Sequence, residues 1–193
     1  MVAALDRDDL IDGLRELVRR ARTEGISGVS IQVLGGAALR LAYFDRPTTM
    51  DIDARIHPVE SLAALIAAIA VERDWPVDWL NANASQFIPA WGMGVRWRPL
   101  LDDDSVSIWV APVDVLLAMK LHALQSRPGR DADDVAKLLR LNDIEDVTAA
   151  EEHYGRFYPG DGFTPRTHDA VQRMFQIGLP AVGDAPLLPS FEP

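Results

Sequence analysis

The fold of this chain is decided by two neighbouring stretches of sequence, VSIQVLGG at residues 29–36 and MDIDARI at residues 50–56. The first stretch alternates apolar and polar residues and is rich in β-branched side chains, which predicts a strand that runs into a turn at Gly35-Gly36. The second stretch predicts another strand, and residues 37–44 between them predict a short helix. The sequence therefore places a glycine turn shortly before an Asp-x-Asp strand.

The rest of the chain is mainly helical in pattern. Apolar residues at helical spacing predict a first helix from Asp6 to Arg22, with Asp6 as its N-cap. A third strand is predicted at residues 106–110, and the irregular residues 77–99 are expected to form loops and one strand. This order predicts an α/β (α+β) fold, with a small mixed β-sheet flanked by helices and a helical C-terminal part. The remaining helices of the chain are predicted after Pro58, after Pro112, and over residues 131–141, 148–157 and 166–177. Pro58 fits the first turn of its helix.

Size and composition predict one cytoplasmic domain. The 193 residues, of which 48% are hydrophobic, are enough for one core and too few for two ordinary domains. We expect a single domain over residues 1–178 and a loose tail over residues 179–193, where four prolines occur. No run approaches the roughly 18 apolar residues of a membrane span, so no membrane partner is expected. Cysteine is absent, so a bound metal would have oxygen or imidazole ligands.

The charge balance argues against nonspecific DNA binding. The chain has 29 acidic and 19 basic residues and a formal net charge of -10, which is the wrong sign for coating a polyanion. A local basic face stays open as an alternative to a solvated surface, because arginines cluster at Arg15, Arg19, Arg20 and Arg22, at Arg96 and Arg98, and at Arg127 and Arg130.

The strongest candidates for chemistry are the carboxylates of Asp51 and Asp53. Side chains two residues apart on a strand point to the same side, with their roots about 7 Å apart. Their oxygens could converge on Mg²⁺ or Mn²⁺, which prefer oxygen ligands and keep positions open for water and phosphate. Gly35-Gly36 could receive the phosphate, because glycine permits close backbone approach and a helix N-terminus follows at Ala37. Taken singly, these features are also typical of a solvated strand and a simple turn.

Taken in order, the features resemble the opening signature of the nucleotidyltransferase superfamily. In that signature a Gly-Gly or Gly-Ser turn precedes an Asp-x-Asp strand, as GGA at residues 35–37 precedes TMDID at residues 49–53. The later segments resemble motifs of the AbiEii and MenT toxin branch: AP at residues 111–112, LLAMKL at 116–121 and RDADD at 130–134. The resemblance covers well over half of the chain and leaves both termini unexplained.

The resemblance implies the minimal nucleotidyltransferase fold and a metal-dependent transfer of an NMP from an NTP. In this branch the acceptor is often the 3′ end of tRNA, and the enzyme is the toxin of a toxin–antitoxin pair with a small antitoxin protein as partner. Carried onto this sequence, Asp51 and Asp53 would hold the metal and Lys120 would contact the triphosphate. Asp131 or Asp134 would support catalysis, although both also suit the N-terminal end of a helix.

Several side chains have two interpretations. Thr49 either orders the turn before the metal strand or touches phosphate, and Lys120 either faces the site or extends to solvent. Arg127 and Arg130 could bind triphosphate or RNA backbone, because a guanidinium fork fits phosphate oxygens. His122 is expected to be structural.

One departure from the superfamily pattern leaves other functions open. Many nucleotidyltransferases have a third carboxylate on a later strand, but residues 106–110 contain none and Asp102, Asp103 and Asp104 fall in the preceding loop. Either Asp104 approaches the site, or two carboxylates work with substrate oxygens. The alternatives are a noncatalytic binding or regulatory protein of the same fold, and an enzyme with a protein or small-molecule acceptor.

Overall fold

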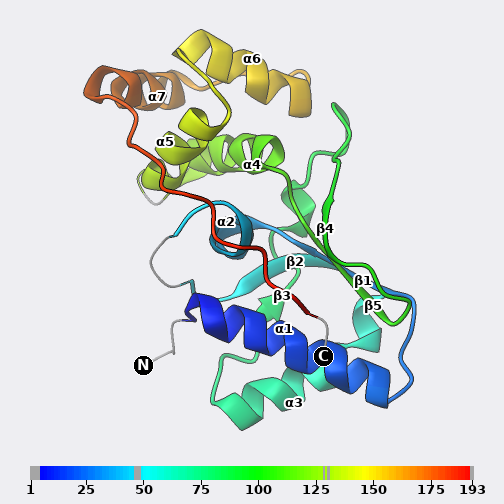
Figure 1. Ribbon diagram of the computed structural model, residues 1–193. Helices are drawn as coiled ribbons and strands as arrows, with labels where there is room; N and C mark the ends of the chain where they lie inside the picture. The colour runs from blue at the N-terminus through cyan, green and yellow to red at the C-terminus, as the bar shows by residue number, and fades with distance from the viewer. Residues whose placement is uncertain (1–4, 46–48, 128, 130, 192–193) are drawn as a thin grey trace. The chain divides into compact units, whose positions relative to one another are not determined.

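The chain is described by a computed structural model that covers residues 5–45, 49–127, 129 and 131–191 (Figure 1). It divides into two compact units. The sheet unit comprises Met1–Gln86, Trp97–Ala111 and Asp184–Pro193, and the helical unit comprises Phe87–Arg96 and Pro112–Gly183. The single domain expected over residues 1–178 stays a prediction.

The described part of the sheet unit contains one five-stranded mixed sheet. In spatial order the strands are β3 (Leu80–Asn81), β2 (Ile52–His57), β1 (Val29–Val33), β5 (Val106–Val110) and β4 (Arg98–Leu101). The central strand β1 pairs antiparallel with β2 and parallel with β5, while β3 is parallel to β2 and β4 is antiparallel to β5. The small mixed sheet predicted from the sequence is therefore confirmed. Residues 77–99 contain one more strand segment than expected, because β4 begins within them.

Three helices of the sheet unit pack with this sheet. They are α1 (Arg7–Thr23), α2 (Gly35–Ala42) and α3 (Ala63–Arg73). The predicted N-cap is confirmed: Asp6 accepts a hydrogen bond from the Asp9 N–H at 2.9 Å, and the Asp9 carboxylate accepts one from the Asp6 N–H. Pro58 does not lie in the first turn of α3, because its backbone is extended and it precedes a short 3-10 turn at Val59–Ser61.

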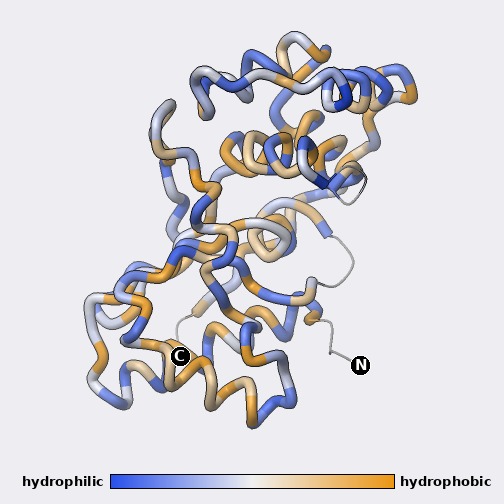
Figure 2. The backbone as a smooth tube through the Cα atoms, turned by 180° about the vertical axis from the view of Figure 1, so that it is seen from behind, coloured by the Kyte–Doolittle hydropathy of each residue, from blue (hydrophilic) through white to orange (hydrophobic). Residues whose placement is uncertain are grey.

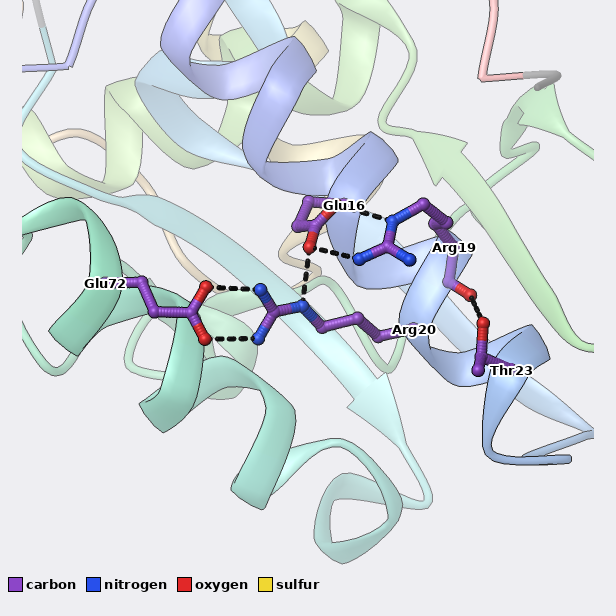
Figure 3. Close-up of polar contacts among 5 residues, drawn as sticks. All are labelled: Glu16, Arg19, Arg20, Thr23 and Glu72. Carbon is purple, nitrogen blue, oxygen red and sulfur yellow. Dashed lines mark hydrogen bonds and ion pairs between the residues drawn. The ribbon is translucent and has the colours of Figure 1, made fainter.

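An ion-pair network joins α1 to α3 (Figure 3). Arg20 donates a hydrogen bond to Glu72 of α3 at 2.8 Å, and the two side chains form a two-pronged ion pair. Within α1, the Glu16 carboxylate accepts hydrogen bonds from Arg19 and Arg20. The hydrogen bond from Arg19 is the main reason that the pKa of Glu16 falls to about 2. Both helices are thereby held together on one side of the sheet unit.

The helical unit confirms the predicted helical C-terminal part. Its helices are α4 (Val113–Ser126), α5 (Ala132–Leu141), α6 (Val147–Phe157) and α7 (Pro165–Ile177). Side chains cap two of them: Asp146 accepts from the Ala149 N–H at 2.8 Å, and Thr164 accepts from the Thr167 N–H at 3.2 Å. Hydrophilic and hydrophobic residues alternate along the helices (Figure 2), as expected for elements buried on one face.

Buried His153 holds α6 against the start of α4. Its Nε2 lies 2.9 Å from the carbonyl oxygen of Asp114, and Arg156 donates to its Nδ1 at 2.8 Å. This pattern requires the neutral ring, and burial is the main cause that lowers the pKa of His153 below its ordinary 6.5. The neutral ring therefore contributes its full stability above pH 6.5, the ordinary pKa of histidine. This stability is lost as the pH falls through the lowered pKa of His153.

We expect His153→Gln to flatten the acid dependence of stability. Glutamine carries both a donor and an acceptor but does not titrate, so it removes the proton uptake that favours the unfolded chain in acid. Urea unfolding at about pH 7.5 and about pH 5.5 measures the free energy of unfolding at each pH. One titrating group can change this free energy by at most about 1.4 kcal/mol for each pH unit. His168→Gln, at a partly exposed site, is the control. If the free energy of unfolding of His153→Gln changes between the two pH values as much as that of wild type, His153 is not the source of the acid dependence.

The C-terminal segment after Ile177 has no helix or strand among its described residues. Its later part is nevertheless attached to α1, because Arg7 donates to the Leu187 carbonyl at 2.6 Å and Arg15 donates to the Ser190 carbonyl at 2.9 Å. The side chain of Phe191 is also buried. The prolines thus produce an irregular backbone, as expected, while residues 187–191 contact the sheet unit. Over the described ranges, each helix is too short or too polar to cross a membrane.

Candidate functional site

The structure brings Asp53 and Gly35 together, and the predicted turn at Gly35-Gly36 is instead the start of α2. Strand β1 leads through Leu34 into α2, and the Leu34 N–H donates to the Asp53 carbonyl of the neighbouring strand at 2.8 Å. Gly35 has a φ of +57°, which disfavours any residue with a Cβ, and a Cβ there would lie 3.1 Å from Asp53 Oδ2. Glycine is therefore favoured at position 35 by both its backbone conformation and the close carboxylate.

The Asp53 carboxylate thus lies at the N-terminal end of α2. Gly35 and Gly36 are the first two residues of this helix, and its N-cap Leu34 provides no side-chain hydrogen bond. The first N–H groups of a helix lack intrahelical partners and carry partial positive charge, which attracts anions. This end of α2 offers the backbone features that bind phosphate, with a carboxylate beside it that could hold a cation.

Asp51 lies one residue before β2, so the strand begins later than the predicted Met50. Its carboxylate Oδ2 accepts a hydrogen bond from Asn81 Nδ2 at 2.9 Å. Asn81 is the pairing partner of Asp53 on β3, and the β2–β3 pairing continues through the Ile52 N–H to the Trp79 carbonyl at 2.6 Å. The short strand β3 therefore positions the first of the two carboxylates.

Asn81 is a site residue that the sequence did not predict. Its amide also donates to the Asp78 carbonyl at 3.1 Å, and its oxygen accepts from the Asn83 N–H at 2.8 Å. These contacts fix the orientation of the side chain toward Asp51. The only sequence signal is the Asn-Ala-Asn spacing, which is typical of a local turn and gives no sign of a contact 30 residues away.

Thr49 contacts the backbone of Asp51. Its hydroxyl donates to the Asp51 carbonyl at 3.2 Å, and its backbone forms two hydrogen bonds with Leu5. These contacts favour the first of its two interpretations, in which Thr49 orders the turn before the metal strand.

Lys120 belongs to the helical unit, where it is enclosed by two carboxylates. Its Nζ on α4 lies 2.5 Å from Asp131 Oδ1 and 2.9 Å from Asp134 Oδ2, at the start of α5. The three side chains are only 13%, 8% and 7% exposed, respectively. Lys120 therefore does not extend to solvent. We call these three residues the Lys120 cluster.

The Lys120 cluster also changes the interpretation of Asp131. This residue is the N-cap of α5, but its carboxylate makes no capping hydrogen bond and pairs with Lys120 instead. Its second oxygen, Oδ2, is buried and has no hydrogen-bond partner among the described residues. One ammonium between two carboxylates gives the Lys120 cluster a formal charge of -1, and one acceptor of the cluster is buried and unsatisfied.

The remaining predicted residues lie outside these two groups. Arg127 is exposed at the C-cap of α4, and Arg130 falls outside the described residues. His122 is structural in its contacts, because its Nδ1 lies 2.9 Å from Tyr154 Oη and its ring stacks on Tyr158. Burial is the main cause that raises the pKa of Tyr154 to about 12, so its hydroxyl stays protonated beside this ring nitrogen.

The third carboxylate remains unassigned. Of the three aspartates before β5, Asp103 forms an ion pair with Arg22 at 2.9 Å, and Asp104 is exposed and accepts a backbone hydrogen bond from Gly28. No group of three or more acidic, histidine or cysteine side chains is arranged to hold a metal ion within the part of the chain that the structure describes. A cation held by Asp51 and Asp53 would take its other ligands from water and substrate, which suits Mg²⁺.

Comparison with known protein families, with curated proteins and with solved structures found no match for this chain.

Proposed function

We propose that this chain is a nucleotidyltransferase that moves an NMP from an NTP to an acceptor, with Mg²⁺ or Mn²⁺ held by Asp51 and Asp53. One observation supports the proposal: the Asp53 carboxylate lies close to Gly35, the residue that begins α2, so a candidate cation ligand adjoins a helix N-terminus of the kind that accepts phosphate. Phosphoryl transfer needs little beyond charge neutralisation and in-line positioning. The two carboxylates and the helix end are suited to both tasks.

Each residue has a defined part in this proposal. Asp51 and Asp53 supply oxygen ligands, Gly35 and Gly36 bring backbone N–H groups close to a phosphate, and Thr49 and Asn81 orient Asp51. A bound divalent cation would neutralise the charge that develops on the triphosphate. Because Lys120 is engaged with Asp131 and Asp134, its first role is to hold these carboxylates in place, and its contact with the triphosphate stays a prediction.

The acceptor and the biological role are proposed from the sequence resemblance. We infer an RNA acceptor, the 3′ end of tRNA, and a cytoplasmic toxin that is neutralised by a small antitoxin. Incubating the protein with labelled NTPs, Mg²⁺ and total tRNA tests the acceptor, and labelled RNA is the expected product. If RNA stays unlabelled while protein or a small molecule is labelled, the acceptor is wrong and the transfer chemistry stands. If no molecule is labelled with any NTP, the enzyme proposal is wrong and the chain is better explained as a noncatalytic binding protein.

We expect Asn81→Ala to weaken Mn²⁺ binding and nucleotidyl transfer roughly 10- to 100-fold, the usual cost of losing a partner that orients a metal ligand. The physical reason is the lost hydrogen bond to Asp51 Oδ2. Electron paramagnetic resonance of free Mn²⁺ measures the affinity.

The matched control for Asn81 is Asn83→Ala, two residues away on an exposed turn. Asn81→Ser, which keeps a short donor, should recover part of the affinity. Equal Mn²⁺ affinity in Asn81→Ala and wild type would show that the hydrogen bond has no role in metal binding.

A further inference from the structure

The sheet unit contains a cavity beside α1, here called the α1 cavity, that the proposed function does not use. Its volume is about 470 Å³, and small-molecule pockets range from roughly 300 to 1,000 Å³. The lining comes from α1, from Arg73 at the end of α3, and from Phe191 in the C-terminal segment that lies beside α1 (Figure 1). All three segments belong to the sheet unit, so the cavity is formed within one compact unit.

Four guanidinium groups line the α1 cavity. Three come from α1, where residues 15, 19 and 22 follow helical spacing and therefore share one face. The fourth comes from α3, which the ion pair between Arg20 and Glu72 holds against α1. The arginines of the lining are Arg15, Arg19, Arg22 and Arg73.

Two carboxylates, Asp12 and Glu16, also line the cavity, and arginines already engage both of them. Asp12 accepts a hydrogen bond from Arg15 at 3.3 Å, and Glu16 accepts two from Arg19 at 2.8 and 2.6 Å (Figure 3). Four guanidinium groups against two carboxylates give the lining a formal charge of +2, although the whole chain has a formal net charge of -10. The cavity is thus a local excess of positive charge in an acidic protein.

Two of these arginines keep most of their hydrogen-bonding capacity. A guanidinium has five N–H donors. Within the part of the chain that the structure describes, Arg22 donates one hydrogen bond, to Asp103 at 2.9 Å, and Arg73 forms no ion pair. The Arg73 guanidinium instead lies over the Trp75 ring, 4.9 Å from the ring centre. A guanidinium over a ring keeps its in-plane N–H groups for other partners, so Arg22 and Arg73 can both donate to an oxyanion.

Apolar side chains complete the lining. Val18 and Phe191 border the cavity and are otherwise almost fully buried. Arg15 donates to the Ser190 carbonyl at 2.9 Å, which holds the backbone beside Phe191. The α1 cavity therefore combines excess positive charge with an ordered apolar wall, as suits an anion that carries an apolar body.

We propose that the α1 cavity binds a small organic dianion with an apolar body, either a phosphate monoester or a dicarboxylate. Its oxygen atoms accept hydrogen bonds from the Arg22 and Arg73 guanidinium groups, and its apolar body contacts Phe191. The two excess positive charges of the lining favour a dianion over a monoanion. The binding does not depend on the proposed nucleotidyl transfer, since the described residues that line the cavity include neither Asp51 nor Asp53.

Titration calorimetry of the full chain with phenyl phosphate and with phthalate, in buffer freed of divalent cations, tests the proposal. We expect Arg73→Gln to weaken binding about 10-fold, because it removes charge-assisted hydrogen bonds. The matched control is Arg98→Gln, which removes an exposed arginine from β4 of the same unit and should bind like wild type. Both variants should keep the wild-type melting temperature, since both arginines are exposed. Equal affinity in Arg73→Gln and wild type would overturn the inference.

The choice of ligand tests the chemical class. Binding of phenyl phosphate alone identifies a phosphate monoester, and binding of phthalate alone identifies a dicarboxylate. Benzoate has one charge and should bind more weakly than either dianion. Methyl phosphate keeps the charge but lacks the ring, and it should bind roughly 10-fold more weakly than phenyl phosphate. The inference is overturned if neither dianion binds, or if benzoate or methyl phosphate binds as tightly as phenyl phosphate.

A variant of the transfer site separates this inference from the proposed function. Asp51→Asn/Asp53→Asn should bind the dianion like wild type, since it changes only the proposed cation ligands. Dianion binding that Arg73→Gln weakens, in a protein that labels no acceptor, would retain the cavity site and reject the enzyme. Acceptor labelling by a wild type that binds no dianion would retain the enzyme and overturn the cavity site.

Discussion

Asp53→Asn is expected to reduce nucleotidyl transfer by at least roughly 10²- to 10³-fold, the loss typical of removing one group that stabilises transition-state charge. Asparagine has nearly the shape of aspartate but not its charge, so the contact with Gly35 is retained while the cation loses an anionic ligand. Single-turnover transfer with saturating NTP measures the chemical step. Asp51→Asn should show a loss of similar size, because the two carboxylates act on one cation.

The control for these variants is Asp102→Asn, which removes an exposed carboxylate from a loop of the same sheet unit. It should transfer at the wild-type rate. Circular dichroism melting should show that Asp53→Asn remains folded, because the substitution leaves the buried strand residues Ile52 and Ala54 unchanged. Transfer by Asp53→Asn at the wild-type rate would remove this carboxylate from the mechanism.

Lys120→Met is expected to destabilise the protein by about 3–5 kcal/mol, the usual cost of removing one partner from a buried ion pair. Methionine fills much of the lysine stem but removes the ammonium that pairs with Asp131 and Asp134, both less than a tenth exposed. Urea unfolding measures the loss. Lys137→Met is the matched control on α5, because its partner Asp133 is 73% exposed and such pairs contribute roughly 0–1 kcal/mol.

A combined variant separates charge from packing in the Lys120 cluster. Adding Asp131→Asn and Asp134→Asn to Lys120→Met removes every charge of the cluster and should recover much of the lost stability. If Lys120→Met is no less stable than Lys137→Met, the buried ion pairs do not hold α4 and α5 together. If the combined variant is as unstable as Lys120→Met, the loss comes from packing instead of unpaired charge.

Much of the fold could be predicted because it is encoded in local patterns. The alternation of Val29–Val33 and the apolar spacing of α1 each follow from residues that are neighbours in sequence. The position of strand β3 within residues 77–99 could not be predicted, for the opposite reason. It contains only Leu80 and Asn81 and depends on backbone pairing with β2, a contact that leaves no periodicity in the sequence.

The candidate site likewise has parts that the sequence predicted and parts that it did not. The order of Gly35, Asp51 and Asp53 predicted a glycine end beside a carboxylate, and the structure places Gly35 against Asp53. The partner of Asp51 could not be predicted, because Asn81 is a common turn residue far along the chain. Likewise, the spacing of α4 showed that Lys120 stands among leucines but not that two carboxylates of α5 enclose it.

If Asp51 and Asp53 together hold a divalent cation, a nucleoside triphosphate should bind at that cation. Titration calorimetry with Mn²⁺ and each of the four NTPs measures this binding, in wild type and in the double variant Asp51→Asn/Asp53→Asn. We expect wild type to bind at least one NTP only when Mn²⁺ is present and the double variant to bind none. Equal Mn²⁺-dependent binding in both proteins, or no binding in wild type, would show that the two carboxylates do not form the site.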